Sequence, residues 1–302
     1  MVNWDEQLMR ALLFVPGSDE RKLAKVGTFG ADVIVIDLED AVADAEKTAA
    51  RVTTRAAIPT YGDQQVVTVR VNGIETGRIE DDIAAVVCPE LAAVMVPKIE
   101  DTETLVVVDR LLGAAEREQG IEVGSVRVIA IVETPRGIVR CDEILEQAPP
   151  RTVTAVFGLG DFSVALGVEL TPEAAELAYA RGRVVVATRA AGMVAPIDGP
   201  FLALEDEQGL LVDSRRARSL GFQGKIAVYP PQVDSIQRAF SELSEAGVAA
   251  TRRLVEAFEE AEAGGVASIR IDGKFVDYPI YNLARRKLDR WQSYLRTSES
   301  AQ

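Results

Sequence analysis

Short apolar runs rich in β-branched residues alternate along this chain with longer segments that mix apolar and charged residues. Each run is too short for a helix, so it is typical of a buried strand. Eight such runs occur, each followed by a segment that can form a helix or helical turn. The predicted strands are residues 11–16, 32–40, 66–73, 91–100, 128–132, 154–159, 193–200 and 225–232.

Helix signals mark the segments between these runs. A first helix is predicted to begin at Ser18 or Asp19, and a later one is predicted to be capped by Thr171 and opened by Pro172. Further helices are predicted at about 45–58, 75–87, 101–119 and 205–221, the last of which ends at a glycine. The chain therefore repeats one unit, a strand followed by a helix.

Eight strand–helix units within about 230 residues match the size of a (β/α)8 TIM barrel. A doubly wound open sheet usually has fewer strands, and its GxGxxG phosphate fingerprint is missing after the first run. We therefore predict an α/β protein with a closed barrel over residues 1–235.

The chain continues beyond what a barrel needs. A long amphipathic helix is predicted from Pro231 towards Glu262, stopping at the next two glycines. An IDGK turn, a short strand near residues 274–277 and a final helix from about Pro279 follow. Residues 236–302 are thus predicted to form a C-terminal helical extension.

Composition excludes several classes of function. The formal charge of −14 argues against nucleic acid and anionic membranes as partners, because both require a basic surface. The two cysteines are far apart, which indicates neither a disulfide framework nor a zinc site. The chain has no histidine, which excludes Ser-His-Asp chemistry and imidazole bases. With no long apolar run and no signal-peptide pattern, a cytoplasmic enzyme is expected.

Two of the predicted strands end in an acidic residue beside glycine or proline. These residues are Glu133 in VETPRG and Asp161 in GLGDF. Parallel strands joined by a crossover helix bring their carboxyl ends to the same edge, so the two carboxylates are expected to meet. Hard oxygen ligands with open coordination positions suit Mg²⁺. From the residues alone, Asp161 is also consistent with an N-cap of the following turn.

Other polar residues also follow predicted strands. They are Asp37, Glu39, Asp40, Arg70, Lys98 and Asp198. In a barrel they would converge at one mouth. Arg70 could pair with Glu39 or Asp40 whether or not it also contacts a ligand. Asp37, Glu39 and Asp40 are expected to orient Arg70 or metal-bound water, and Lys98 is as consistent with a solvated loop as with a ligand contact.

Basic residues cluster near the amino terminus. They are Arg10, Arg21, Lys22 and Lys25. Such a cluster could contact a polyanionic small ligand, although charged helix faces are more often simply solvated.

Several stretches together resemble the citrate lyase β-subunit-like family, which includes malyl-CoA and citramalyl-CoA lyases. They are RALLFVPGSDERKLAK, DVIVIDLEDAV, VRVNG, IVETPRG and GLGDFS, with weaker matches in GKIAVYPPQV and GKFVDYP. They span almost the whole chain in consistent order, which is more specific than any single motif.

The resemblance implies a Mg²⁺-dependent carbon–carbon lyase, with Mn²⁺ as the alternative ion. It implies cleavage or formation of a 3-hydroxyacyl thioester from an acyl thioester and a 2-oxo acid. Glu133 and Asp161 would hold the metal, and Arg70 would contact the substrate. From their charge, Arg10, Arg21 and Lys25 are the candidates for contacting coenzyme A, and the residues leave open whether the thiol carrier is coenzyme A or an acyl-carrier protein. The family also implies a homotrimer or hexamer, in which Asp277 of an adjacent subunit is the acid–base residue.

The chemistry of these residue types agrees with those roles. A fixed guanidinium such as that of Arg70 stabilises the oxygen of a thioester enolate without losing its proton. Moving a proton at carbon requires a base that is not bound to the metal, and Asp277 on a covering segment would be partly dehydrated. One departure stands out, because Val228 or Tyr229 occupies the stretch where the family often carries a histidine.

Three rival functions stay open at the level of sequence. One is an aldolase acting on free hydroxy-oxo acids, although its relatives use a histidine base. Another is a malate synthase or thioesterase variant that hydrolyses the thioester. The third is a homologue without catalytic activity.

Overall fold

The computed structural model describes residues 2–62, 64–241 and 245–300. The chain divides into two compact units, residues 1–240 and 241–302. The sequence placed this boundary after residue 235. The division lies later because Val233 and Ile236 belong to the core of the first unit and Ala239 is also buried.

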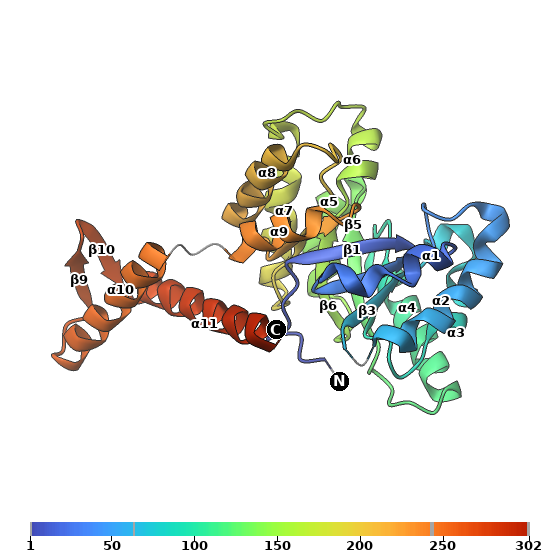
Figure 1. Cartoon of the computed structure of the whole chain (residues 1–302), viewed down its shortest axis with the longest axis horizontal. Helices are drawn as coiled ribbons and strands as arrows, with labels where there is room; N and C mark the ends of the chain where they lie inside the picture. Colours follow the sequence, from blue (N-terminus) through green and yellow to red (C-terminus); the bar gives the residue numbers. More distant parts are fainter. Residues whose placement is uncertain (1, 63, 242–244, 301–302) are drawn as a thin grey trace. The chain divides into compact units, whose positions relative to one another are not determined.

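The first unit is a closed barrel of eight parallel strands in sequence order, as predicted (Figure 1). The strands are β1 (Ala11–Pro16), β2 (Val33–Asp37), β3 (Val66–Arg70), β4 (Ala93–Val96), β5 (Arg127–Val132), β6 (Thr152–Phe157), β7 (Ile197–Asp198) and β8 (Gly224–Ala227). β1 pairs with β8, which closes the barrel. β7 is much shorter than the predicted run 193–200, and Pro196 and Pro200, which flank it, cannot donate to a strand ladder.

Helices surround the barrel. They are α1 (Glu20–Leu23), α2 (Lys47–Tyr61), α3 (Ile79–Val86), α4 (Thr102–Glu118), α5 (Pro135–Glu146), α6 (Leu159–Leu166), α7 (Ala178–Ala190), α8 (Glu207–Leu220) and α9 (Gln232–Ser241). Local sequence explains several of their ends. The Thr134 hydroxyl accepts the Gly137 N–H and Pro135 opens α5, while Gly221 ends α8 in the left-handed conformation.

The helix predicted to start at Thr171 and Pro172 begins instead at Ala178. Ala174 has a φ of 49°, a left-handed conformation that interrupts any helix started at Pro172. The Glu176 carboxylate accepts the backbone N–H and the hydroxyl of Thr171, which stabilises a turn there. The predicted cap is therefore wrong.

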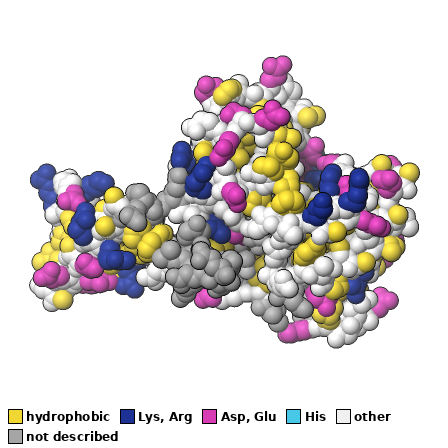
Figure 2. All heavy atoms as spheres, in the orientation of Figure 1, with side chains coloured by type: hydrophobic (Ala, Val, Ile, Leu, Met, Phe, Trp, Pro, Cys, Tyr) yellow, Lys and Arg dark blue, Asp and Glu magenta, His cyan; other side chains and the backbone are white. Residues whose placement is uncertain are grey.

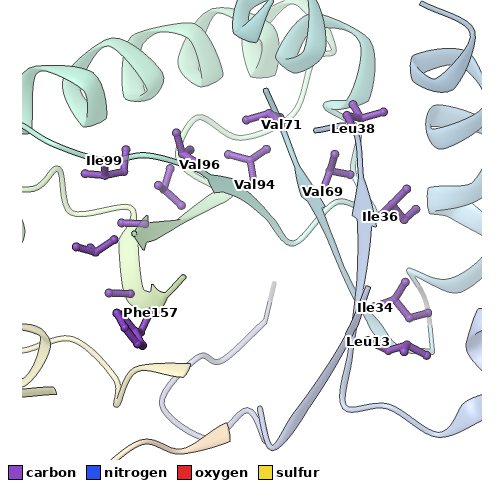
Figure 3. Close-up of a cluster of buried hydrophobic side chains, with 14 of the residues drawn as sticks. Leu13, Ile34, Ile36, Leu38, Val69, Val71, Val94, Val96, Ile99 and Phe157 are labelled. Carbon is purple, nitrogen blue, oxygen red and sulfur yellow. The ribbon is translucent and has the colours of Figure 1, made fainter. Parts of the chain in front are cut away.

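Side chains alternate between the inside of the barrel and its helical coat. One buried cluster fills the barrel interior and includes Leu12, Val35, Met95, Ile131 and Ile226. The larger cluster lies between strands and helices. Figure 3 draws part of it and labels Leu13, Ile34, Ile36, Leu38, Val69, Val71, Val94, Val96, Ile99 and Phe157. Because side chains alternate along a strand, a residue's place in this alternation determines which layer it enters.

The second unit consists of α10 (Glu245–Ala263), β9 (Ser268–Ile271), β10 (Lys274–Asp277) and α11 (Tyr278–Ser300). The two strands form an antiparallel hairpin whose turn, Asp272–Gly273, has positive φ at both residues, as Asp-Gly hairpins require. The turn and β10 were predicted, whereas β9 was not. The long predicted helix is two described helices, α9 and α10, and residues 242–244 between them lie outside the described part.

The surface carries many charged side chains, in agreement with the composition. Acidic and basic side chains are both spread over the face seen in Figure 2. Within the residues that the structure describes, no helix combines the length and apolar character that crossing a membrane requires.

Candidate active site

The carboxyl ends of the strands open onto one pocket of about 220 Å³. Its lining residues are Phe14, Asp40, Arg70, Ile131, Glu133, Gly158, Leu159, Gly160, Asp161, Pro200, Ile226 and Val228. They come from strands or strand ends around the barrel, so the pocket lies at the barrel mouth. The lining combines charged side chains with apolar ones.

Glu133 directly follows β5, in the same alternation as Ile129 and Ile131, and therefore faces the barrel interior. Its carboxyl group is almost fully buried and accepts the backbone N–H of Lys98 at 2.9 Å. Burial, followed by the negative charges of Glu39 and Asp161, raises the pKa of Glu133 to about 8.

Gly158 leaves the space that the Glu133 carboxylate occupies. A Cβ atom at residue 158 would lie 2.2 Å from Oε2 of Glu133, a distance that no real contact allows. The glycine at the end of β6 therefore lets a buried carboxylate lie directly against the backbone of the next strand.

Asp161 lies in the first turn of α6 and lines the same pocket. The N-cap of this helix is Gly158, so the alternative that Asp161 caps the helix is wrong. A carboxylate in the first turn is favoured by the helix dipole. At 40% side-chain exposure, Asp161 is far more accessible than Glu133.

Glu133 and Asp161 fit a divalent cation. Both offer carboxylate oxygens, the ligands that Mg²⁺ prefers, and both face the same pocket. The repulsion that raises the pKa of Glu133 is the kind that a bound cation relieves. In the described part of the chain, no three acidic or cysteine side chains are grouped closely enough to hold a metal ion by themselves.

Arg70 ends β3 and also faces the barrel interior. Its Nε and Nη2 each donate to one oxygen of Asp37 at 2.7 Å, which forms a two-point ion pair. Nη1 lies 2.9 Å from Oε2 of Glu39 and 3.5 Å from Asp40, and the guanidinium lies over the Phe14 ring at 5.2 Å. The guanidinium is thus fixed from several sides while still lining the pocket.

Asp37 orients other groups and is almost fully buried. Besides Arg70, its oxygens accept the backbone N–H groups of Glu39 and Ala41. The buried Lys47 ammonium donates to the carbonyls of Leu38 and Glu39 and holds the same loop. Of the two roles that the sequence left open for Asp37, these contacts favour orientation of Arg70.

Lys98 is part of this network, a role that the sequence left undecided. Its Nζ lies 3.1 Å from Oε1 of Glu39 and 4.0 Å from Oδ2 of Asp161. Burial raises the pKa of Glu39, and the cations Arg70 and Lys98 oppose this effect. The sequence signal was the position of Lys98 just past β4, at the same edge as the other site residues.

Asp198 does not reach the mouth, contrary to expectation. Its neighbour Ile197 faces the barrel interior, so Asp198 faces the helical coat. There its carboxylate pairs with Arg181 and Lys225 and is fully buried. The alternation of residues along β7 could have predicted this outcome.

The basic cluster is divided between the two ends of β1. Arg10 precedes β1, at the end opposite the pocket, and its Nη2 lies 2.6 Å from Oδ1 of Asp32. The structure therefore does not bring Arg10 to the mouth. Arg21 and Lys25 follow the carboxyl end of β1 and are exposed to solvent. These two residues are on the side of the barrel where the pocket opens.

Three further residues were named from the sequence. Val228 lines the pocket, whereas Tyr229 does not and is 41% exposed. Asp277 ends β10 in the second unit, where its Oδ1 is 3.4 Å from the backbone N of Ile280 at the start of α11.

Comparison with known proteins identifies the group to which this chain is similar. A family model described as HpcH/HpaI aldolase/citrate lyase matches residues 10–230. Citrate lyase subunit beta from Leuconostoc mesenteroides is 34% identical over 284 residues, 93% of each chain. A (3S)-malyl-CoA thioesterase from Cereibacter sphaeroides is 34% identical over 270 residues, 89% of each.

Solved structures agree with these sequence relatives. The CitE protein from Mycobacterium tuberculosis, in complex with magnesium, acetoacetate and coenzyme A, superposes with a TM-score of 0.78. It is 27% identical, and the match covers 95% of this chain and 99% of that one. The chain therefore belongs to the HpcH/HpaI aldolase/citrate lyase family and is a lyase of that family.

Proposed function

We propose that this protein is a Mg²⁺-dependent carbon–carbon lyase acting on a coenzyme A thioester. The substrate is a 3-hydroxy-3-carboxyacyl thioester such as malyl-CoA, citramalyl-CoA or a citryl thioester. Cleavage yields an acyl thioester and a 2-oxo acid, and the reaction also runs in reverse. The observation that carries this proposal is the meeting of Glu133, Asp161 and Arg70 at one pocket.

Glu133 and Asp161 would hold the metal. The burial of Glu133 and the negative charges of the neighbouring carboxylates favour binding of a cation there. The CitE complex with magnesium and coenzyme A supports both the ion and the thioester carrier. When bound, Mg²⁺ polarises the carbonyl of a chelated 2-oxo acid. Mn²⁺ is the alternative ion.

Arg70 contributes a permanent positive charge beside the acidic pair. Asp37 and Glu39 fix its guanidinium before any substrate binds. Such a group stabilises negative charge developing on the thioester oxygen, with little reorganisation during the reaction. The apolar residues that line the same pocket reduce the access of water to that oxygen.

Asp277 is proposed as the acid–base residue, delivered by the second unit of a neighbouring subunit in a trimer or hexamer. Glu133 and Asp161 serve the metal and Asp37 serves Arg70, so a separate carboxylate suits proton transfer at carbon. The second unit also exposes the apolar side chains of Phe275 and Leu283, as surfaces that dock on other chains commonly do. Arg21 and Lys25 are proposed to contact the phosphates of coenzyme A.

A Mg²⁺-dependent screen of malyl-, citramalyl-, β-methylmalyl- and citryl-thioesters tests this function. We expect one of them to be cleaved to a 2-oxo acid, with turnover abolished by EDTA and by Glu133→Ala or Asp161→Ala. Circular dichroism should show that both variants remain folded. Activity only on free 4-hydroxy-2-oxo acids, or normal turnover in either variant, would refute the proposal.

Thioester hydrolysis is the second candidate, because the (3S)-malyl-CoA thioesterases are as similar to this chain as the citrate lyase subunits. The two activities differ in their products. Cleavage of malyl-CoA gives acetyl-CoA and glyoxylate, whereas hydrolysis gives malate and free coenzyme A. Product analysis with a thiol reagent for free coenzyme A distinguishes them.

A further inference from the structure

Lys98 contacts three carboxylates that have different tasks in the proposed function. Its ammonium lies 3.1 Å from Glu39 and 4.0 Å from Asp161, and its backbone N–H donates to Glu133 at 2.9 Å. Lys98 therefore links the carboxylate beside Arg70 with both members of the proposed metal pair.

The backbone of Lys98 is held in an unusual conformation. Its φ is 53°, in the left-handed region that residues with a side chain adopt infrequently and that persists where the surroundings enforce it. Lys98 is the second residue after β4, and in this conformation its backbone N–H donates to Glu133. The side chain is 34% exposed, which places the ammonium at the margin of the pocket.

Glu39 is the carboxylate that could change partners. It is buried, with Oε2 2.9 Å from Nη1 of Arg70 and Oε1 3.1 Å from Nζ of Lys98. Its charge also acts on Glu133, so the two carboxylates are close enough to interact. A divalent cation attracts all nearby carboxylate oxygens, so a Glu39 without Lys98 would be drawn towards an ion at Glu133 and Asp161.

We propose that Lys98 is a positioning residue that keeps Glu39 beside Arg70 and prevents it from becoming a third protein ligand of the cation. This inference rests on the proposed function. The arrangement keeps Arg70 aligned and leaves coordination positions open for the oxo acid.

The Lys98→Met variant tests this role, because it keeps an unbranched side chain of similar length and removes the charge. We expect the Kd of Mn²⁺, measured without substrate by electron paramagnetic resonance, to fall about threefold or more. We expect kcat for the best thioester to fall about tenfold or more, because Arg70 and the open coordination positions are both disturbed. Lys98→Arg should return the Kd and kcat most of the way to their wild-type values. If Lys98→Met only disrupted the fold, Mn²⁺ binding would weaken and kcat would fall together.

Removing the positive charge of Lys98 could by itself tighten Mn²⁺ binding, without any movement of Glu39. The Lys98→Met change is therefore also made in a variant that lacks the Glu39 charge. In Glu39→Gln protein, the Lys98→Met change should tighten Mn²⁺ binding much less than in wild type. Arg110→Met removes a charge from the exposed face of α4 and should leave the Kd unchanged.

Each contrary result has a distinct meaning. Unchanged or weaker Mn²⁺ binding, unchanged kcat, or equal tightening in the Glu39→Gln background would overturn the role of Lys98. If instead Glu133→Ala binds Mn²⁺ as wild type does, the proposed metal site itself fails.

Discussion

At the scale of single residues, the direction of a side chain decides its role at this barrel mouth. Asp37, Arg70 and Glu133 continue the inward-facing positions of their strands and meet at the pocket or just below it. Asp198 ends β7 at an outward-facing position, so its side chain lies among the helices that surround the barrel. Acidic residues at strand ends are therefore candidates for this site only when their place in the alternation is inward.

The two-point ion pair between Asp37 and Arg70 should matter more than the longer contact with Asp40. Asp37→Asn removes the charge that aligns the guanidinium, so we expect kcat/KM to fall about 10- to 100-fold. Asp40 is 3.5 Å away and 62% exposed, so Asp40→Asn should change kcat/KM by no more than about threefold. Steady-state kinetics of both variants test this order, and a larger effect at Asp40 would contradict it.

Gly158 should be essential for the position of Glu133. Gly158→Ala places a methyl group in the space of the carboxylate, so we expect Mn²⁺ affinity to fall about tenfold or more. Gly160 is the matched control, because a Cβ there meets no atom within 4 Å. Titration calorimetry of both variants checks this, and equal affinities would show that Glu133 does not depend on the glycine.

At the scale of elements, a buried ion network joins the last two strands of the barrel to the helices outside them. Arg181 on α7 and Asp213 on α8 pair with each other, and Lys225 on β8 pairs with Asp213 and with Asp198 on β7. Two cations and two anions balance in the protein interior. Removal of one partner would leave an unpaired buried charge, which is strongly destabilising.

Asp213 should contribute stability that depends on pH. Burial alone would raise its pKa, but Lys225 and Arg181 lower it from 3.8 to about 2. Because the folded pKa lies below the unfolded value, this contribution is present above about pH 4 and lost as the pH falls through 2. The shift corresponds to about 2 kcal/mol.

Asp213→Asn should therefore lower the free energy of unfolding at pH 7 by about 3 kcal/mol and flatten its decline between pH 4 and pH 2. Urea unfolding across this pH range measures both effects. Asp142→Asn is the surface control, because its pair with Arg183 is half exposed and should contribute less than about 0.5 kcal/mol. An equal loss in both variants would contradict the account.

Local sequence predicted the elements best where one residue type has one physical use. Gly221 indicates the end of α8, and the helix predicted at 205–221 does end at this glycine. The start of α7 was not predictable from Thr171 and Pro172, because the left-handed backbone at Ala174 has no signal in its residue type. The left-handed backbone of Lys98, whose N–H donates to Glu133, likewise has no signal in the residue type.

At the scale of the whole molecule, regular repetition made the barrel predictable, and the meeting of the proposed metal ligands at one pocket followed from it. Eight apolar runs separated by helical segments allow few other folds. Glu133, Asp161 and Arg70 were assigned to one mouth because all parallel strands end there. The network around Lys98 was not predictable, since it depends on distances between loops that follow different strands.

If Asp277 serves a neighbouring subunit, two inactive variants should complement each other. Glu133→Ala lacks the metal site and Asp277→Ala lacks the base, yet a mixed oligomer contains some sites with both groups intact. We expect mixing under conditions of subunit exchange to restore up to about a quarter of wild-type turnover. Co-purification of differently tagged subunits verifies exchange, and exchange without recovered activity would count against a shared site.

Anomalous diffraction from crystals soaked with Mn²⁺ and a 2-oxo acid tests the central claim most directly. We expect one manganese peak within bonding distance of the carboxylate oxygens of both Glu133 and Asp161, with the keto acid chelating the same ion. A peak elsewhere, or an ion that contacts neither carboxylate, would contradict it.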